Sequence, residues 1–249
     1  MNAAAKDSLL ASPAARLAQR ELVNHRLLRF LRVHIYSTLP KLKEIAGYTS
    51  HQGIRQALVR LERRDLVRHH LLTGPGQRLT LWGITHAGQA LAFDLDSEMP
   101  VATAFEPSKL AYSTVPHHLD LQLLRIRAEA DGWREWQHGD RFGAVGKDDK
   151  RPDAVAIDPT GSCFAIECER SIKTPQRYRV ILSIYLQAIR AGKYSGVFWV
   201  SPTDDVSQRV KKIVLAIEKV AVDGRPVSVD PARHHKFLFF TTYQKWPSA

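Results

Sequence analysis

Three acidic residues in the second half of the sequence, Asp153, Glu167 and Glu169, have the types and spacing of a divalent-cation site. Glu167 and Glu169 stand two residues apart in a run typical of a strand, so both side chains should project to the same side. If Asp153 begins the neighbouring strand, three carboxylates meet at one strand end. Hard cations such as Mg²⁺ or Mn²⁺ bind oxygen ligands of this kind. The sequence therefore predicts a metal site at these three residues.

An ionic network is the alternative interpretation of the same acids. Arg151, Arg170 and Lys173 flank them in the sequence. Clustered carboxylates are unfavourable unless positive charge neutralises them, and pairing with these cations could cap an edge of a sheet without a metal. Both interpretations stay open at this point.

The elements that would position the acids alternate between helical and strand periodicity over residues 117–249. The predicted elements are a helix at 117–131, strands at 133–136, 153–157 and 163–169, a helix that begins at 174 and is ended by Gly192, a strand at 196–201, a helix at 206–220 and a strand at 236–241. A polar loop or hairpin tip is expected at 142–149. This order predicts an α/β core with a mixed sheet, in which Cys168 faces away from the acids and belongs to the core.

The first third of the chain shows a different order, with three helices followed by a hairpin. Helices are expected from residue 21 to about 35, at 38–47 and at 51–65, and strands at 66–68 and 78–82 enclose a turn at 73–77. The apolar spacing of Leu58, Leu61 and Leu66, followed by the Trp82-Gly-Ile-Thr85 string, resembles the winged helix-turn-helix of bacterial DNA-binding proteins. Residues 16–88 carry 13 lysines and arginines against 4 acids, a balance that favours polyanion binding.

The winged-helix resemblance implies contacts with double-stranded DNA, in which the third helix enters the major groove and the hairpin reaches the backbone. The candidates for base and phosphate contacts are His51, Gln52, Arg55, Gln56 and Arg60, and the candidates for phosphate contacts are Lys41, Lys43 and Arg78. The alternative is a solvated basic face used for protein contacts.

The second half of the chain carries a further resemblance. Pro152-Asp153, 13 intervening residues and then Glu167-x-Glu169, within the predicted element order, resemble the PD-(D/E)XK nuclease fold. Together with an N-terminal winged helix, the His117-x-Leu119 opening of the second domain and the Glu-x-Glu-x-x-x-Lys stretch, they resemble the replication-relaxation family, which includes MobC-type plasmid mobilisation proteins.

This family resemblance implies metal-dependent cleavage of DNA near an origin of plasmid transfer or replication. Asp153 and Glu167 match the metal-binding acids, and Mg²⁺ or Mn²⁺ is the implied cofactor. Glu169 stands where the nuclease signature has lysine, and Lys173 is the nearest substitute. The implied catalytic set is therefore Asp153, Glu167, Glu169 and Lys173.

Composition bounds the class of protein. The chain has 249 residues, 44% hydrophobic and 24% charged, with a formal net charge of +11, which excludes wholesale disorder and collagen-like composition. Its two cysteines cannot form a disulfide framework, and the apolar runs are too short to span a membrane. We expect a cytoplasmic protein with a mobile arm or a frayed helix at 1–20, a winged helix at 21–93, a linker at 94–116 and a nuclease-like domain at 117–249.

Two functions are compatible with these observations. In the first, the winged helix selects an origin-type DNA site and the second domain nicks or relaxes it. In the second, the chain is a non-catalytic DNA-binding accessory or repressor, and its degenerate nuclease fold serves for dimerisation or partner docking. The expected partners are double-stranded DNA, other mobilisation or relaxosome proteins and a second copy of the chain in a homodimer.

Overall fold

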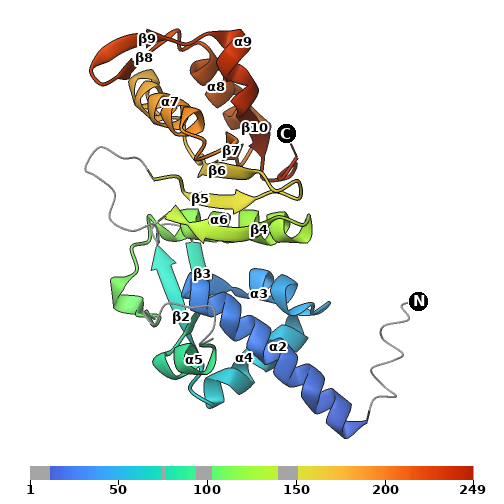
Figure 1. The fold of residues 1–249 in the computed structure, drawn as a ribbon. Coiled ribbons are helices and arrows are strands. Elements are labelled where there is room, and N and C mark those ends of the chain that lie inside the picture. Colours follow the sequence, from blue (N-terminus) through green and yellow to red (C-terminus); the bar gives the residue numbers. More distant parts are fainter. Residues whose placement is uncertain (1–11, 75–76, 94–102, 140–150, 249) are drawn as a thin grey trace. The chain divides into compact units, whose positions relative to one another are not determined.

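The computed structural model describes residues 12–74, 77–93, 103–139 and 151–248. The chain divides into two compact units, residues 1–119 and 120–249 (Figure 1). Each unit combines helices with a β-sheet. The expectation of a mixed α and β fold is therefore confirmed.

The first unit contains helices and a three-stranded antiparallel sheet of order β1-β3-β2. Its elements are α2 (Pro13–His34), β1 (Tyr36–Thr38), α3 (Leu39–Ala46), α4 (His51–Arg63), β2 (Val67–Gly74), β3 (Gln77–Ile84), α5 (His86–Leu91), the 3-10 helix η1 (Pro107–Lys109) and the start of α6 (Val115–Ala130). The three predicted helices and the predicted hairpin are all present. Strand β1, which pairs with β3, was not predicted.

Helix α2 begins eight residues earlier than the sequence analysis placed it. The side chain of Ser12 accepts a hydrogen bond from the backbone N–H of Ala15 at 3.2 Å, and Pro13 occupies the first helical turn. This capping pattern, followed by an alanine-rich stretch, favours a helix start. Residues 13–20, expected in a mobile arm or a frayed helix, are therefore helical, and their side chains are exposed to solvent.

Part of the predicted linker belongs to the first unit. Phe105 is fully buried, and its backbone N–H donates to the carbonyl of Ile84 at 2.8 Å. A Cβ at Gly83 would lie 2.0 Å from the Phe105 ring, so only glycine leaves room for the ring there. Arg68 also donates to the Phe105 carbonyl. Residues 103–116 are thus packed chain, and the rest of the predicted linker lies outside the described residues.

The second unit is built on a five-stranded mixed sheet of order β10-β7-β6-β5-β4. Strands β10, β7 and β6 are parallel, whereas β5 and β4 are antiparallel to their neighbours. Its elements are the remainder of α6, β4 (Arg134–His138), β5 (Ala154–Ile157), β6 (Cys163–Cys168), α7 (Pro175–Arg190), β7 (Gly196–Ser201), α8 (Asp204–Leu215), β8 (Lys219–Val222), β9 (Arg225–Ser228), α9 (Pro231–His234), the 3-10 helix η3 (His235–Phe237) and β10 (Leu238–Thr242).

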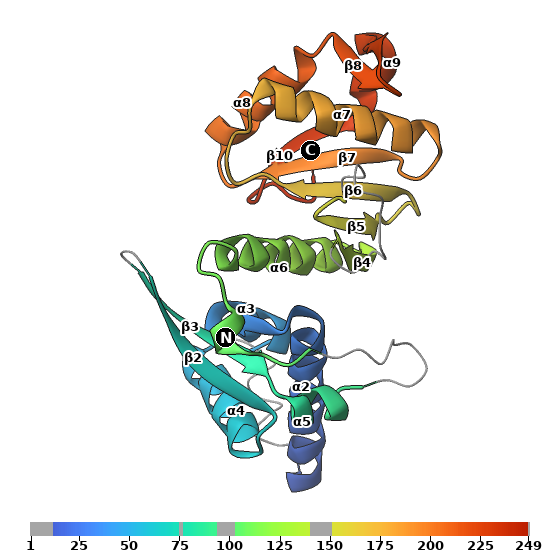
Figure 2. The same cartoon turned by 90° about the vertical axis from the view of Figure 1, so that its left-hand side faces the viewer.

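Helices cover both faces of this sheet (Figure 2). On one face, Tyr178 and Tyr185 of α7 and Val210 of α8 pack against Trp199. On the other face, residues of α6 pack against Ile166 and neighbouring strand residues. Each fully buried apolar side chain contributes about 1.5–3 kcal/mol to folding, so the two apolar layers hold the ends of β5, β6 and β7 in fixed positions.

One prediction for the second unit is wrong, and another concerns residues that the structure does not describe. The helix expected at 206–220 ends at Leu215, and Lys219 and Val220 instead begin strand β8 of the β8–β9 hairpin. The hairpin turn has positive φ at Asp223 and Gly224, which is typical of a tight two-residue turn. The loop predicted at 142–149 lies outside the described residues.

Candidate functional site

Helix α4 presents the first group of candidate residues. Ile54, Leu58 and Leu61 are buried in the first unit. The side chain of Ser50 caps the helix by accepting from the backbone N–H of Gly53 at 3.1 Å. This arrangement leaves the opposite face of α4 open to solvent.

The open face of α4 carries the residues that the winged-helix resemblance assigned to base contacts. The structure places four of the five predicted side chains in exposed positions: His51, Gln52, Arg55 and Gln56. The first turn of α4 contains no acidic residue, so the positive end of the helix dipole faces solvent without a negative side chain of its own. The fifth predicted residue, Arg60, is only partly exposed, and its Nε atom is buried without a hydrogen-bond partner in the described part of the chain.

The acidic residue of α4 is held away from this surface. Glu62 accepts hydrogen bonds from the backbone N–H of His69 at 2.9 Å and contacts the His69 Nδ1 atom at 2.7 Å. His69 lies on β2, so these contacts tie the end of α4 to the hairpin. The open face therefore keeps an excess of positive charge.

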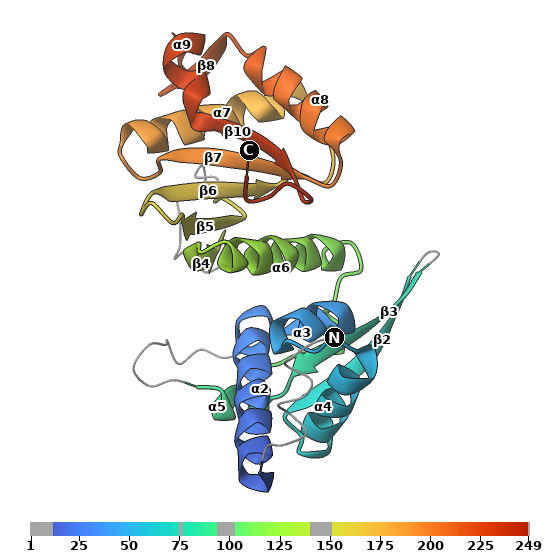
Figure 3. The same cartoon turned by 90° about the vertical axis from the view of Figure 1, so that its right-hand side faces the viewer.

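The three predicted phosphate contacts lie on the elements next to α4. Arg78 is exposed on β3, where it pairs with Thr73 near the end of the β2–β3 ribbon. Lys41 and Lys43 are partly exposed on α3. Figure 3 shows the ribbon extending past α3 and α4. The eight predicted residues thus lie on α3, α4 and the ribbon of the first unit.

The second group of candidates lies where β5 and β6 run side by side. Ala154 pairs with Ile166 in the antiparallel ladder. Continuing this register by one residue places Asp153 opposite Glu167, and opposed residues share one face of a sheet. Glu169 follows the end of β6, and its backbone N–H donates to the carbonyl of Val200 at 2.9 Å. The predicted alternation is confirmed, because the acids lie on one side and Ile166 and Cys168 pack on the other.

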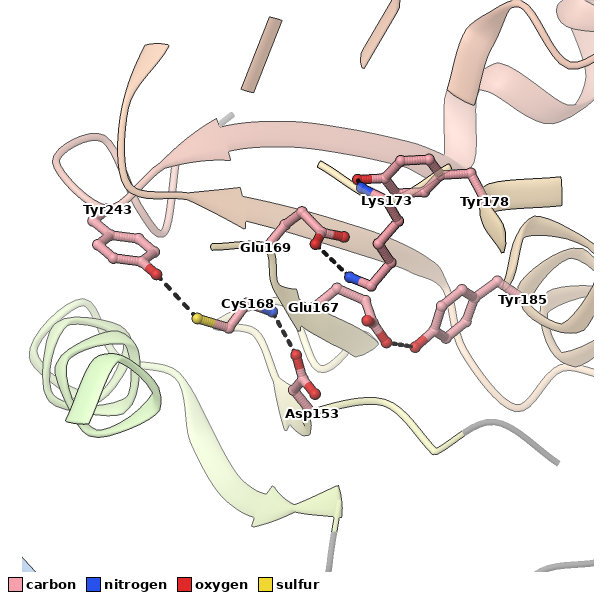
Figure 4. Close-up of polar contacts among 8 residues, drawn as sticks. All are labelled: Asp153, Glu167, Cys168, Glu169, Lys173, Tyr178, Tyr185 and Tyr243. Atoms are coloured by element: carbon pink, nitrogen blue, oxygen red, sulfur yellow. Dashed lines mark hydrogen bonds and ion pairs between the residues drawn. The ribbon is translucent and has the colours of Figure 1, made fainter. Parts of the chain in front are cut away.

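Glu167 is a buried carboxylate that is 2% exposed. The hydroxyl of Tyr185, on α7, donates a hydrogen bond to its Oε1 atom (Figure 4). Burial and the charge of Glu167 raise the pKa of Tyr185 well above its ordinary value. The tyrosine is therefore a neutral donor that stabilises the carboxylate.

Glu169 is also buried, at 1% exposed, and it pairs with Lys173. The Lys173 Nζ atom donates to Oε1 of Glu169, while Oε2 of Glu169 has no hydrogen-bond partner among the described residues. Figure 4 shows the lysine side chain reaching back from the loop after β6 toward the two glutamates. Of the predicted flanking cations, Lys173 is thus paired with a predicted acid.

Asp153 is hydrogen-bonded to the backbone of the neighbouring strand. Its Oδ2 atom accepts from the backbone N–H of Cys168 at 2.8 Å. The Cys168 sulfur contacts the Tyr243 hydroxyl at 3.1 Å, which donates to Asp120 at 2.9 Å. Arg170 also donates to Asp120, so the second flanking arginine pairs with this residue.

The three-carboxylate metal site stays a prediction, and only two of its acids lie directly opposite each other. In the described ranges, no group of three or more His, Cys, Asp and Glu side chains is placed to hold a metal ion. The reason is that Glu169 lies beyond the end of β6 and is occupied by Lys173. Asp153 and Glu167 remain as an opposed pair of carboxylates, and Mg²⁺ commonly binds proteins through one or two carboxylates with water completing its shell. The chemistry of this pair therefore fits Mg²⁺ or Mn²⁺.

Sequence reasoning missed the tyrosines that hold these acids. Tyr178 and Tyr185 are both buried, and their hydroxyls contact the residues of the site. The Tyr178 hydroxyl accepts from the backbone N–H of Lys173 at 3.2 Å, and the Tyr185 hydroxyl donates to Glu167. Their spacing of seven residues on one helix face was the only signal available, and it is equally typical of plain core packing.

Comparisons with known proteins add little to this description. No family model matches the chain, and no curated protein matches it. Among solved structures, a likeness is found to Lactococcus lactis ZitR, as a C30AH42A mutant in apo form. The identity is 22% over 37% of this chain and 68% of that chain, with a TM-score of 0.26. A score this low does not indicate a shared overall fold. Over the residues that the structure covers, no helix combines the length and apolar character needed to cross a membrane.

Proposed function

We propose that the chain binds double-stranded DNA through its first unit, with α4 in the major groove and the β2–β3 ribbon on the phosphate backbone, as in a winged helix-turn-helix. The observation that supports this proposal is the open face of α4. It combines exposed Gln52, Arg55 and Gln56 with a capped, acid-free first turn. Arginine and glutamine are the side chains that pair bidentately with guanine and adenine edges.

The local structure of the first unit also favours a rigid recognition helix. A Cβ at Gly53 would lie 2.8 Å from the Tyr48 ring, so the ring packs closely on the first turn of α4. The contact between Glu62 and His69 fixes the other end of the helix to β2. A helix whose backbone is held at both ends needs little further ordering of that backbone when a ligand binds.

Binding-site selection from a pool of random duplexes tests this proposal. We expect a short preferred sequence to emerge with the full-length protein. Arg55→Ala should then weaken binding to that site by about 1–3 kcal/mol and relax the preference at one position. Arg16→Ala, which removes an equal charge from the exposed start of α2, serves as the control and should have little effect. No selected sequence, or equal losses in both variants, would contradict the proposal.

The second unit supports a second candidate function, hydrolysis of a DNA phosphodiester with a divalent metal, as implied by the PD-(D/E)XK resemblance. The observation that favours it is the opposition of Asp153 and Glu167 beside the amine of Lys173. Asp153 and Glu167 would hold Mg²⁺ or Mn²⁺, which in such sites activates water and stabilises charge on the reacting oxygens. Lys173 would contribute positive charge next to the phosphate.

Incubating the protein with supercoiled DNA that carries a selected site distinguishes a hydrolytic enzyme from a non-catalytic accessory. Relaxation or nicking in Mg²⁺ or Mn²⁺ that is lost in both Asp153→Ala and Glu167→Ala would support hydrolysis. Binding in EDTA without relaxation in either metal would support the accessory or repressor. Roles in plasmid mobilisation or replication, partners in a relaxosome and a homodimer remain predictions from the family resemblance, and a selected sequence found at a transfer or replication origin would support them.

A further inference from the structure

Glu169 stands at the position where the nuclease signature has a lysine, and its surroundings suggest a role for this exchange. The residue is 1% exposed, and a buried carboxylate is unfavourable unless it is paired. Its partner is Lys173, four residues further along the chain. The pair therefore places the amine of Lys173 next to position 169, where the nuclease signature has the amine of its own lysine.

Lys173 is held at two points. Its backbone N–H donates to the hydroxyl of Tyr178, a side chain that is fully buried, at 3.2 Å. Its Nζ atom donates to Glu169 and lies 5.9 Å from the centre of the Tyr178 ring. About one third of the Lys173 side chain remains exposed, at 33%. The side chain is thus held at two points while part of it stays exposed to solvent.

The charge balance of the cluster depends on the same pair. Figure 4 shows the carboxylate of Glu167 on the same side of the sheet as the Lys173 amine. An amine that moved onto Glu167 would compete with a cation for that carboxylate, because both are positive. Glu169 therefore keeps the lysine beside the carboxylate pair and, by pairing with it, prevents an ion pair between Lys173 and Glu167.

We propose that Glu169 is a positioning residue that holds the Lys173 amine beside the Asp153 and Glu167 carboxylates, so that Glu169 and Lys173 together replace the signature lysine. This inference rests on the hydrolytic function proposed for the second unit. It assigns Glu169 a role other than metal binding. It also predicts that the two residues can exchange places.

The decisive variant is the swap Glu169→Lys with Lys173→Glu in the full-length protein, compared with Glu169→Gln, Lys173→Met and Glu167→Gln. Two readouts are used: Mn²⁺ binding by calorimetry, and the rate of relaxation of supercoiled DNA. The swap re-forms the ion pair and puts the amine on the strand. It should therefore keep both Mn²⁺ affinity and relaxation, whereas Glu169→Gln and Lys173→Met should each slow relaxation by about 100-fold without weakening DNA binding.

The possible outcomes distinguish a failure of the positioning role from a failure of the proposed hydrolytic function. If the swap loses Mn²⁺ binding as completely as Glu167→Gln does, Glu169 is a metal ligand and the positioning role is overturned. If the wild type relaxes DNA and Glu169→Gln relaxes it at the same rate, the positioning role is also overturned, while hydrolysis stands. If the wild type neither binds Mn²⁺ nor relaxes DNA, hydrolysis is overturned together with the role of the pair, and DNA binding by α4 is unaffected.

Discussion

The hydroxyl of Tyr185 donates a hydrogen bond to the buried carboxylate of Glu167, which joins α7 to β6 across 18 residues of sequence. Both side chains are at most 2% exposed. If a buried carboxylate loses its hydrogen-bond donor, nothing offsets the desolvation penalty of the charge, and the folded state is destabilised. The contact therefore links the stability of the second unit to the geometry of its candidate site.

Tyr185→Phe should lower the free energy of unfolding by about 1–3 kcal/mol, because the ring is kept while the donor to Glu167 is lost. Urea denaturation at neutral pH measures the change. Tyr194→Phe is the control, since Tyr194 is a buried neighbour whose ring centre lies 6.4 Å from that of Tyr185. Equal losses in the two variants would contradict a special role for the contact with Glu167.

Stability should fall at alkaline pH because of the buried tyrosines. Burial raises the pKa of Tyr36 to about 12, and the pKa values of Tyr178, Tyr185 and Tyr243 are raised as well. Below about pH 10 these groups are protonated in both states, and stability does not depend on them. Above that pH the unfolded chain loses protons first, so the free energy of unfolding falls until the folded-state pKa is reached.

The pH profile of unfolding by urea measures this loss, and Tyr36→Phe should make the decline less steep. A profile of the variant that declines as steeply as that of the wild type would show that Tyr36 does not contribute.

Gly88→Ala should destabilise the first unit by about 3 kcal/mol or more. A Cβ at Gly88 would lie 2.0 Å from the carbonyl oxygen of Leu66, and backbone cannot move aside cheaply. Gly53→Ala is the matched control, because its close neighbour is the movable ring of Tyr48 at 2.8 Å. Thermal unfolding measures both variants, and a Gly88→Ala protein as stable as the control would contradict the packing described.

The two cysteines should differ in reactivity. Burial raises the pKa of Cys168 to about 12, whereas Cys163 is only partly buried and its pKa is raised less. Since the thiolate is the reactive form, a thiol reagent at mildly alkaline pH should label Cys163 first. Mass spectrometry of the native and urea-unfolded protein checks this order. Equal labelling rates in the native state would show that Cys168 is not enclosed as described.

Local signals in the sequence were sufficient for the helices and most strands. Ser50, with the apolar spacing of Ile54, Leu58 and Leu61, predicted α4 to within two residues at its end. Strand β1 was not predicted because a strand of three residues is too short to show a periodic pattern. Its pairing with β3 is fixed only by the tertiary fold. The β8–β9 hairpin had a usable signal in Asp223-Gly224. The helical spacing of apolar residues continues to residue 220, however, and it concealed that signal.

The candidate site was predictable in part. Strand alternation placed Glu167 and Glu169 on one side, and the turn at 158–162 brought Asp153 opposite Glu167. The partners of these acids were not predictable, because Tyr185 and Asp120 reach the sheet only through the packing of α7 and α6. The pairing of Glu169 with Lys173 was foreseen only as part of the alternative ionic network with Arg151, Arg170 and Lys173.

The salt dependence of DNA affinity tests most directly whether the first unit binds the phosphate backbone of duplex DNA. Affinity for a selected duplex is measured over a series of salt concentrations for the wild type and for Arg78→Ala. The logarithm of affinity should fall linearly with the logarithm of salt concentration, and Arg78→Ala should reduce that slope by about 0.9, the value for one lost phosphate contact. A wild-type affinity that does not change with salt would contradict the account.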